Sequence, residues 1–117
     1  MRNGRIIDSN GTVLWYLNYQ RHREDGPAVE RADGSCVWYL NGRLHREDGP
    51  AVEYADGSCL WYVHDQLHRE TGPAIERIDG SCEWWLYDKE YSLVEWLDCV
   101  DISPEQRTLL LLKWGGK

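Results

Sequence analysis

The chain has 117 residues, a length that fits one domain spanning residues 1–117, and its 42% hydrophobic content is enough for a small core. Its 20 acidic residues outnumber 13 basic ones, and the net charge of −7, which falls mainly on residues 45–90, argues against nucleic-acid binding. No apolar run approaches the roughly 20 residues that cross a bilayer, and residues 1–5 lack a signal peptide's apolar stretch, so we expect a cytoplasmic protein without membrane contact.

A sequence motif recurs every 23 residues through most of the chain. The motif His-Arg-Glu-Asp-Gly-Pro-Ala-Val-Glu occupies residues 22–30, and its copies begin at His45 and His68. The motif Asp-Gly-Ser-Cys-Val-Trp-Tyr-Leu occupies residues 33–40, returns at the same step, and has a degenerate earlier copy at residues 10–17. Self-similarity at a fixed period indicates a repeat architecture, here of three full units preceded by a half unit.

Each unit within residues 6–90 predicts a β-hairpin. Asp33-Gly34 and its equivalents are the strongest short hairpin signal, because both residues of a two-residue turn adopt positive φ. Strands at residues 28–32 and 35–40 flank this turn, and a linker rich in Gly and Pro returns the chain to the next hairpin. We therefore expect a mainly β fold, an antiparallel meander sheet of about four repeated hairpins.

The two-residue turn also predicts which side chains share a face. It places Val29 opposite Trp38, and alternation along the strands then puts Val29, Cys36 and Trp38 on one core face. The residues expected together on the other face are Glu30, Tyr39, Glu53, Tyr62, Glu76 and Trp85. We interpret this acid–aromatic row as a candidate partner-binding surface. The alternative is that its carboxylates only pair with arginines across strands.

The pattern changes after residue 90, where two capping boxes appear. Ser-Leu-Val-Glu from Ser92 and Ser-Pro-Glu-Gln from Ser103 predict helices over about residues 92–100 and 103–114. A linear repeat leaves its last unit uncovered, so we expect residues 91–117 to form a helical cap on the sheet. The alternative is that the apolar second helix binds a partner or forms a homodimer.

The cysteines and histidines do not suggest a metal or redox site. Three of the four cysteines recur every 23 residues, which places them about 9–10 Å apart on alternate strands, too far for a disulfide. We expect reduced, buried thiols. The same spacing separates His22, His45 and His68, so they do not converge on one metal ion. We interpret each as a hydrogen-bonding link to the next unit, with a repeated ligand contact as the alternative, and we expect His64 in a turn.

No catalytic signature is present in the sequence. The chain lacks a phosphate-binding glycine loop, a G-x-S-x-G elbow and an H-E-x-x-H motif. Triplicated copies of one motif also favour a repeated surface over a single asymmetric catalytic centre. We therefore expect neither enzyme activity nor a cofactor.

The repeat resembles a known family. The 23-residue period, the Asp-Gly turn, the aromatic strand that follows it and the Asn-Gly-x-Leu-His linker are similar to MORN repeats. The H-R-x-D-G-P-A core is closer to the MORN-variant repeats of small phage, giant-virus and bacterial proteins, over about residues 6–90. The resemblance implies a twisted hairpin sheet used for protein contacts. Some relatives of this kind are described as antitoxins.

Together these features predict a non-enzymatic protein-binding module with a basic partner. The most specific version is a small acidic phage or mobile-element inhibitor that blocks a basic surface of a host defence protein, in the manner of an anti-CRISPR protein. The alternatives are an antitoxin-like neutraliser of a toxin, a nucleotide-binding sponge and a structural assembly module.

Overall fold

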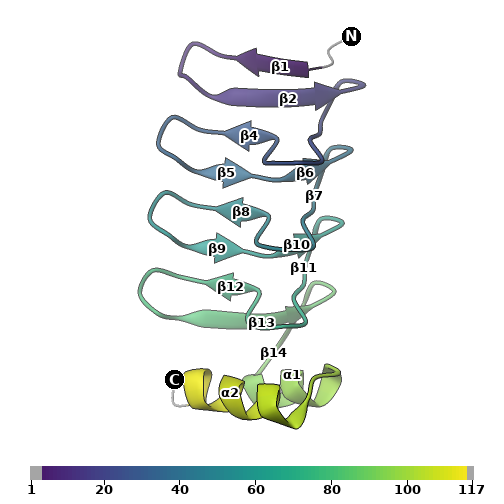
Figure 1. Cartoon of the computed structure of the whole chain (residues 1–117), viewed down its shortest axis with the longest axis vertical. Helices are drawn as coiled ribbons and strands as arrows, with labels where there is room; N and C mark the ends of the chain where they lie inside the picture. The colour runs from purple at the N-terminus through teal and green to yellow at the C-terminus, as the bar shows by residue number, and fades with distance from the viewer. Residues whose placement is uncertain (1–3, 116–117) are drawn as a thin grey trace.

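The computed structural model describes residues 4–115 as one ten-stranded sheet and two two-stranded sheets, with two helices at the C-terminal end, in an elongated molecule of 48 × 26 × 21 Å (Figure 1). The mainly β class, the antiparallel meander and the two C-terminal helices predicted from the sequence are confirmed. The strands in this range are β1 (Gly4–Ile7), β2 (Val13–Leu17), β3 (Gln20–Arg21), β4 (Val29–Glu30), β5 (Cys36–Val37), β6 (Tyr39–Leu40), β7 (Arg43–Leu44), β8 (Val52–Glu53), β9 (Cys59–Leu60), β10 (Tyr62–Val63), β11 (Gln66–Leu67), β12 (Ile75–Glu76), β13 (Cys82–Leu86) and β14 (Lys89–Tyr91).

The Asp-Gly turns contain one residue more than predicted. The Arg31 N–H donates to the Ser35 carbonyl at 2.8 Å, and the Gly34 N–H donates to the Arg31 carbonyl at 3.0 Å, so the loop has three residues. Gly34 has a φ of 95°, whereas Asp33 is not among the residues with positive φ. This is a type I turn followed by a glycine bulge, in which Asp33 accepts the Ser35 N–H at 2.8 Å. The predicted two-residue turn was therefore wrong.

The extra loop residue shifts the strand pairing by one. Val29 lies opposite Val37, and Glu30 lies opposite Cys36, whereas the shorter turn had placed Val29 opposite Trp38. Because directly opposite residues share a face, Val29 lies with Val37 and away from Cys36. The predicted face of the first strand in each hairpin was wrong for this reason.

Two-residue turns do occur, at the other end of each unit. Asn41 and Gly42 have φ angles of 50° and 79° and join β6 to β7. His64 and Asp65, with φ angles of 49° and 66°, join β10 to β11 in the same way, which confirms the prediction of a turn at His64. Positive φ at both central residues is the geometry that favours a tight hairpin.

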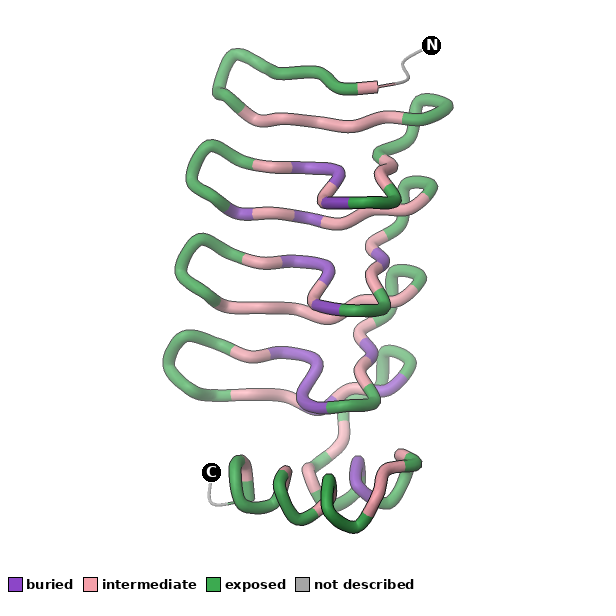
Figure 2. The backbone as a smooth tube through the Cα atoms, in the orientation of Figure 1, coloured by how far each residue is buried: buried purple, intermediate pink, exposed green. Residues whose placement is uncertain are grey.

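The core of the sheet lies on what we call the valine face, defined by Val29, Val37 and Val52. These side chains are 4%, 5% and 7% exposed, and Tyr39 and Tyr62 are among the partly buried residues that pack against them. Figure 2 shows buried segments along β4, β8 and β12, whereas β1 has none. We call the opposite side the Trp face, defined by Trp15, Trp38 and Trp61, all only half-buried. The predicted core of Trp and Cys side chains was wrong in these units.

Two helices lie beyond β13 at the C-terminal end of the sheet (Figure 1). They are α1 (Leu93–Cys99) and α2 (Pro104–Trp114), and both begin at the predicted capping boxes. A second core forms there from Trp84, Leu86, Trp96 and Leu97. The helices therefore cover the last unit of the repeat.

Candidate functional site

The loops that join successive units are built on histidine. These linker loops are residues 22–27, 45–50 and 68–73. His45 Nδ1 accepts the His64 N–H of the next unit's turn at 3.0 Å, and its Nε2 lies 3.0 Å from Glu47 Oε2. Because Nδ1 is an acceptor, the neutral ring carries its proton on Nε2 and donates it to Glu47. The other two loops repeat these bonds. The interpretation of each histidine as a link between units is confirmed.

The next residue of each loop is an arginine that lies against the Trp face. The Arg46 guanidinium lies 3.9 Å from the centroid of the Trp38 ring. Its Nη1 donates to Glu53 Oε1 at 3.0 Å and to the Pro50 carbonyl at 3.1 Å, and its Nε donates to Asp48 at 3.0 Å. A stacked cation with charge-assisted hydrogen bonds holds the loop rigidly on the strand. The loops beginning at His22 and His68 repeat this arrangement.

The last loop keeps the pattern despite its different sequence. Thr71 stands where the other loops have aspartate. The Arg69 Nε instead donates to Thr71 Oγ1 at 3.1 Å. A hydroxyl oxygen at this position accepts the same bond as a carboxylate.

The predicted acid–aromatic row is divided between the two faces of the sheet. The carboxylates lie on the Trp face, each bound by its loop arginine, and they are Glu30, Glu53 and Glu76. Tyr39 and Tyr62 pack on the valine face. Glu83 lies opposite Ile75 in the ladder, on the valine face. Because the Trp85 indole donates to Glu83, Trp85 lies on the valine face too. The one-residue shift in register separated these groups.

A row of exposed carboxylates instead runs along the linker loops. We call it the loop ridge; its members are Glu24, Asp25, Glu47, Asp48 and Glu70, whose side chains are 81%, 88%, 79%, 84% and 62% exposed. Each is bonded through one oxygen to a loop histidine or arginine. Successive loops lie two strands apart, about 9.6 Å. The repeated Arg-Glu-Asp sequence was the signal for this row, which the sequence analysis did not include among the candidate binding residues.

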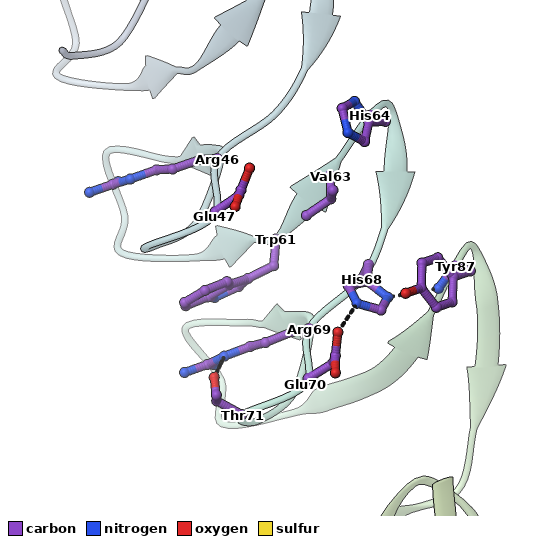
Figure 3. Close-up of a pocket in the computed structure, with 10 residues that line it drawn as sticks. All are labelled: Arg46, Glu47, Trp61, Val63, His64, His68, Arg69, Glu70, Thr71 and Tyr87. Atoms are coloured by element: carbon purple, nitrogen blue, oxygen red, sulfur yellow. Dashed lines mark hydrogen bonds and ion pairs between the residues drawn. The ribbon is translucent and has the colours of Figure 1, made fainter. Parts of the chain in front are cut away.

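Two equivalent clefts lie between successive loops on the Trp face. The Trp61 cleft has a volume of 420 Å³ and is drawn in Figure 3, where the Trp61 ring lies between Arg46 and Arg69. The Trp38 cleft, one unit earlier, has a volume of 390 Å³. Matching residues line the two clefts: Arg46, Glu47, Trp61, Val63, His68 and Glu70 in one, and Arg23, Glu24, Trp38, Leu40, His45 and Glu47 in the other. Each cleft combines an aromatic and apolar wall with acidic residues of the ridge.

The thiols of the Trp face are poor nucleophiles at neutral pH. Burial raises the pKa of Cys36, and the carboxylates of Glu30 and Glu53 raise it further. Burial likewise raises the pKa of Cys59. Only the thiolate attacks, so a raised pKa slows the reaction. Among residues 4–115, no three His, Cys, Asp or Glu side chains converge to hold a metal ion.

Comparisons of the chain with protein-family models, with curated proteins and with solved structures gave no match. The resemblance to MORN-variant repeats therefore rests on the repeated residues of this sequence. Across the part of the chain that the structure describes, no helix has the length and apolar character needed to cross a membrane.

Proposed function

We propose that the protein is a non-enzymatic binding module that presents its loop ridge to a basic surface of another protein. The ridge carries the proposal, because its five carboxylates are exposed, recur with the repeat and are held in place by loop histidines and arginines. Loops that are already ordered lose little conformational entropy on binding. Clustered negative charge also speeds the encounter with a positively charged partner.

The most specific form of this proposal is an inhibitor from a phage or another mobile element. Such a protein would act in the host cytoplasm and cover a basic, nucleic-acid-binding surface of a defence protein. Its support is the net charge of −7 together with the regular spacing of the ridge, which offers negative charge at intervals along a rigid support. An antitoxin that neutralises a basic toxin would use the same surface and is the closest alternative.

A nucleotide-binding sponge has less support from the clefts. A phosphate needs cationic donors, but Nε and Nη1 of Arg46 already donate to three oxygens of the protein. The carboxylates of Glu47 and Glu70 at the same cleft repel an anion. A structural assembly module is supported by α2, where Leu109 and Leu112 are 64% and 78% exposed. Homodimer formation through this helix is compatible with a free ridge.

A charge-neutralised variant tests the proposal. The ridge variant carries Glu24→Gln, Asp25→Asn, Glu47→Gln and Asp48→Asn, which keep an oxygen acceptor for each internal hydrogen bond. The matched control removes the same number of negative charges far from the loops, at Glu90, Asp98, Asp101 and Glu105. We expect immobilised wild-type protein and the control to retain a basic protein from bacterial lysate that salt releases, and the ridge variant to lose it. Equal retention by the ridge variant would contradict the proposal.

A further inference from the structure

The two open clefts have a third equivalent, where a tryptophan of the chain itself covers the wall in place of the arginine that stacks on Trp38 or Trp61. One unit after the Trp61 cleft, the corresponding wall residues are Trp84 and Leu86, which are only 5% and 9% exposed. Trp96 of α1 covers them; its ring centroid lies 4.7 Å from that of Trp84, and it is 0% exposed. Leu97 beside it is 3% exposed and belongs to the same cluster. A Trp-Leu pair on a short helix is therefore the occupant of this position.

A hydrogen bond fixes the indole of Trp96 at the wall of this third position. The Trp96 Nε1 donates to the Arg69 carbonyl at 3.0 Å. Arg46 and Arg23 stand at the equivalent positions of the Trp61 and Trp38 clefts. Within residues 4–115, no group donates a hydrogen bond to either of these two carbonyl oxygens. Each open cleft thus has the carbonyl acceptor that the chain uses for its own indole and the same aromatic residue at its wall, with Arg46 stacked on Trp38 and Arg69 on Trp61 at 3.9 Å.

The rims of the open clefts differ from that of the filled one in charge. Leu93 and Val94 occupy the repeat positions that Glu70 and Thr71 occupy one unit earlier. The filled position is therefore apolar on that side, whereas Glu47 and Glu70 line the Trp61 cleft. An occupant of the open clefts has to satisfy these carboxylates, so basic residues next to the aromatic ring are favoured.

We propose that the Trp38 and Trp61 clefts each bind a tryptophan of a partner protein, flanked by lysine or arginine, whose indole N–H donates to the carbonyl of Arg23 or Arg46. This inference rests on the proposed function and names the kind of partner segment that the ridge recognises. Cleft volumes of 390 and 420 Å³ exceed that of an indole side chain. A large ring in a pocket supplies affinity, while the surrounding carboxylates set orientation and the rate of encounter.

A pair of peptides tests the inference. Acetyl-Lys-Trp-Leu-Lys-amide copies Trp96-Leu97 with basic flanks, and acetyl-Lys-Ala-Leu-Lys-amide is its matched control. The peptides are titrated into methyl-labelled protein and followed by NMR. We expect the tryptophan peptide to bind at least about tenfold more tightly and its indole to give nuclear Overhauser effects to the methyl groups of Leu40 and Val63. The methyl groups of Leu86 should show no such effect in the wild type and gain one in Trp96→Ala.

The outcomes separate this inference from the proposed function. If both peptides bind equally and the ridge variant abolishes both, charge alone recognises the partner, so the inference is wrong and the proposed function stands. If the indole contacts lie elsewhere on the protein, or if neither peptide binds, the inference is overturned. Peptide binding to the two open clefts is measured in the wild-type protein, so the result does not depend on whether Trp96→Ala folds.

Discussion

Trp96 packs against Trp84 with 4.7 Å between the ring centroids, whereas each earlier unit packs an arginine against the corresponding tryptophan. The residue that stands in the frame of that arginine is Ser92, which instead caps α1. The helix then supplies the group that covers the last tryptophan. The repeat can end at this point because the helix covers the surface that a further unit would otherwise cover.

Removal of this contact should destabilise the protein strongly. We expect Trp96→Ala to lower the free energy of unfolding by about 3–5 kcal/mol, because a fully buried indole is replaced by a cavity. Leu112→Ala, at a position 78% exposed on α2, is the control and should change it by less than about 0.5 kcal/mol. Urea denaturation measures both. Similar losses at the two positions would mean that α1 does not cover the sheet.

Engineered cross-links test the strand register. Glu30 lies directly opposite Cys36 across β4 and β5, so Glu30→Cys should form a disulfide with Cys36 under mild oxidation. Arg31→Cys, one residue further along, should not, because it lies opposite Ser35. Mass spectrometry of the non-reduced proteins distinguishes the two. A cross-link in the second variant alone would indicate the register of a two-residue turn instead.

Acid should destabilise the protein through carboxylates whose pKa is lower in the folded state. The pKa of Glu83 lies below its usual 4.5, first because Arg77 donates a hydrogen bond to it and then because Trp85 does. A lowered pKa contributes stability above the unfolded value, and this contribution is lost as the pH falls through the folded value. We expect the urea concentration at the unfolding midpoint to decrease as the pH is lowered below about 4.5, and to decrease less steeply in Glu83→Gln. An equal pH dependence of the midpoint in that variant would show that Glu83 does not contribute to the loss of stability in acid.

The thiols should differ in reactivity according to their exposure. Cys99 is exposed, whereas burial raises the pKa of Cys36 and Cys59. At pH 8 we expect a maleimide reagent to label Cys99 first and the other two at least about tenfold more slowly. Peptide mapping after timed quenching measures the order. Labelling of Cys36 as fast as Cys99 would show that its strand opens readily.

The sequence was sufficient to predict the repeated hairpins and the helix boundaries, but not the face of each strand. Asp33-Gly34 suits both a two-residue turn and a three-residue loop, because each places glycine at positive φ. The choice moves the first strand by one residue, so it exchanges the environments of Val29 and Glu30. The tight turn at His64-Asp65 contains no glycine, and its geometry depends on the His45 ring that accepts the turn's N–H.

The candidate site was hidden by the same ambiguity. A two-residue turn would place Glu53 and Tyr62 on the same face, whereas Glu53 is held by Arg46 on the Trp face and Tyr62 packs on the valine face. The loop ridge depends on how far each linker stands out from the sheet. Each linker is held to the sheet by an arginine stacked on a tryptophan, a contact between residues eight apart that periodicity does not reveal.

The rate of association with the basic protein recovered from lysate tests the central claim most directly. Surface plasmon resonance would measure the association rate constant of the wild type, of the ridge variant and of the matched control over a range of salt concentrations. We expect the wild type and the control to associate quickly and to slow as salt rises, because salt screens the ridge. The ridge variant should associate more slowly at low salt and respond less to it. A ridge variant that associates as fast as the wild type at low salt would contradict the claim that the linker loops bind the partner.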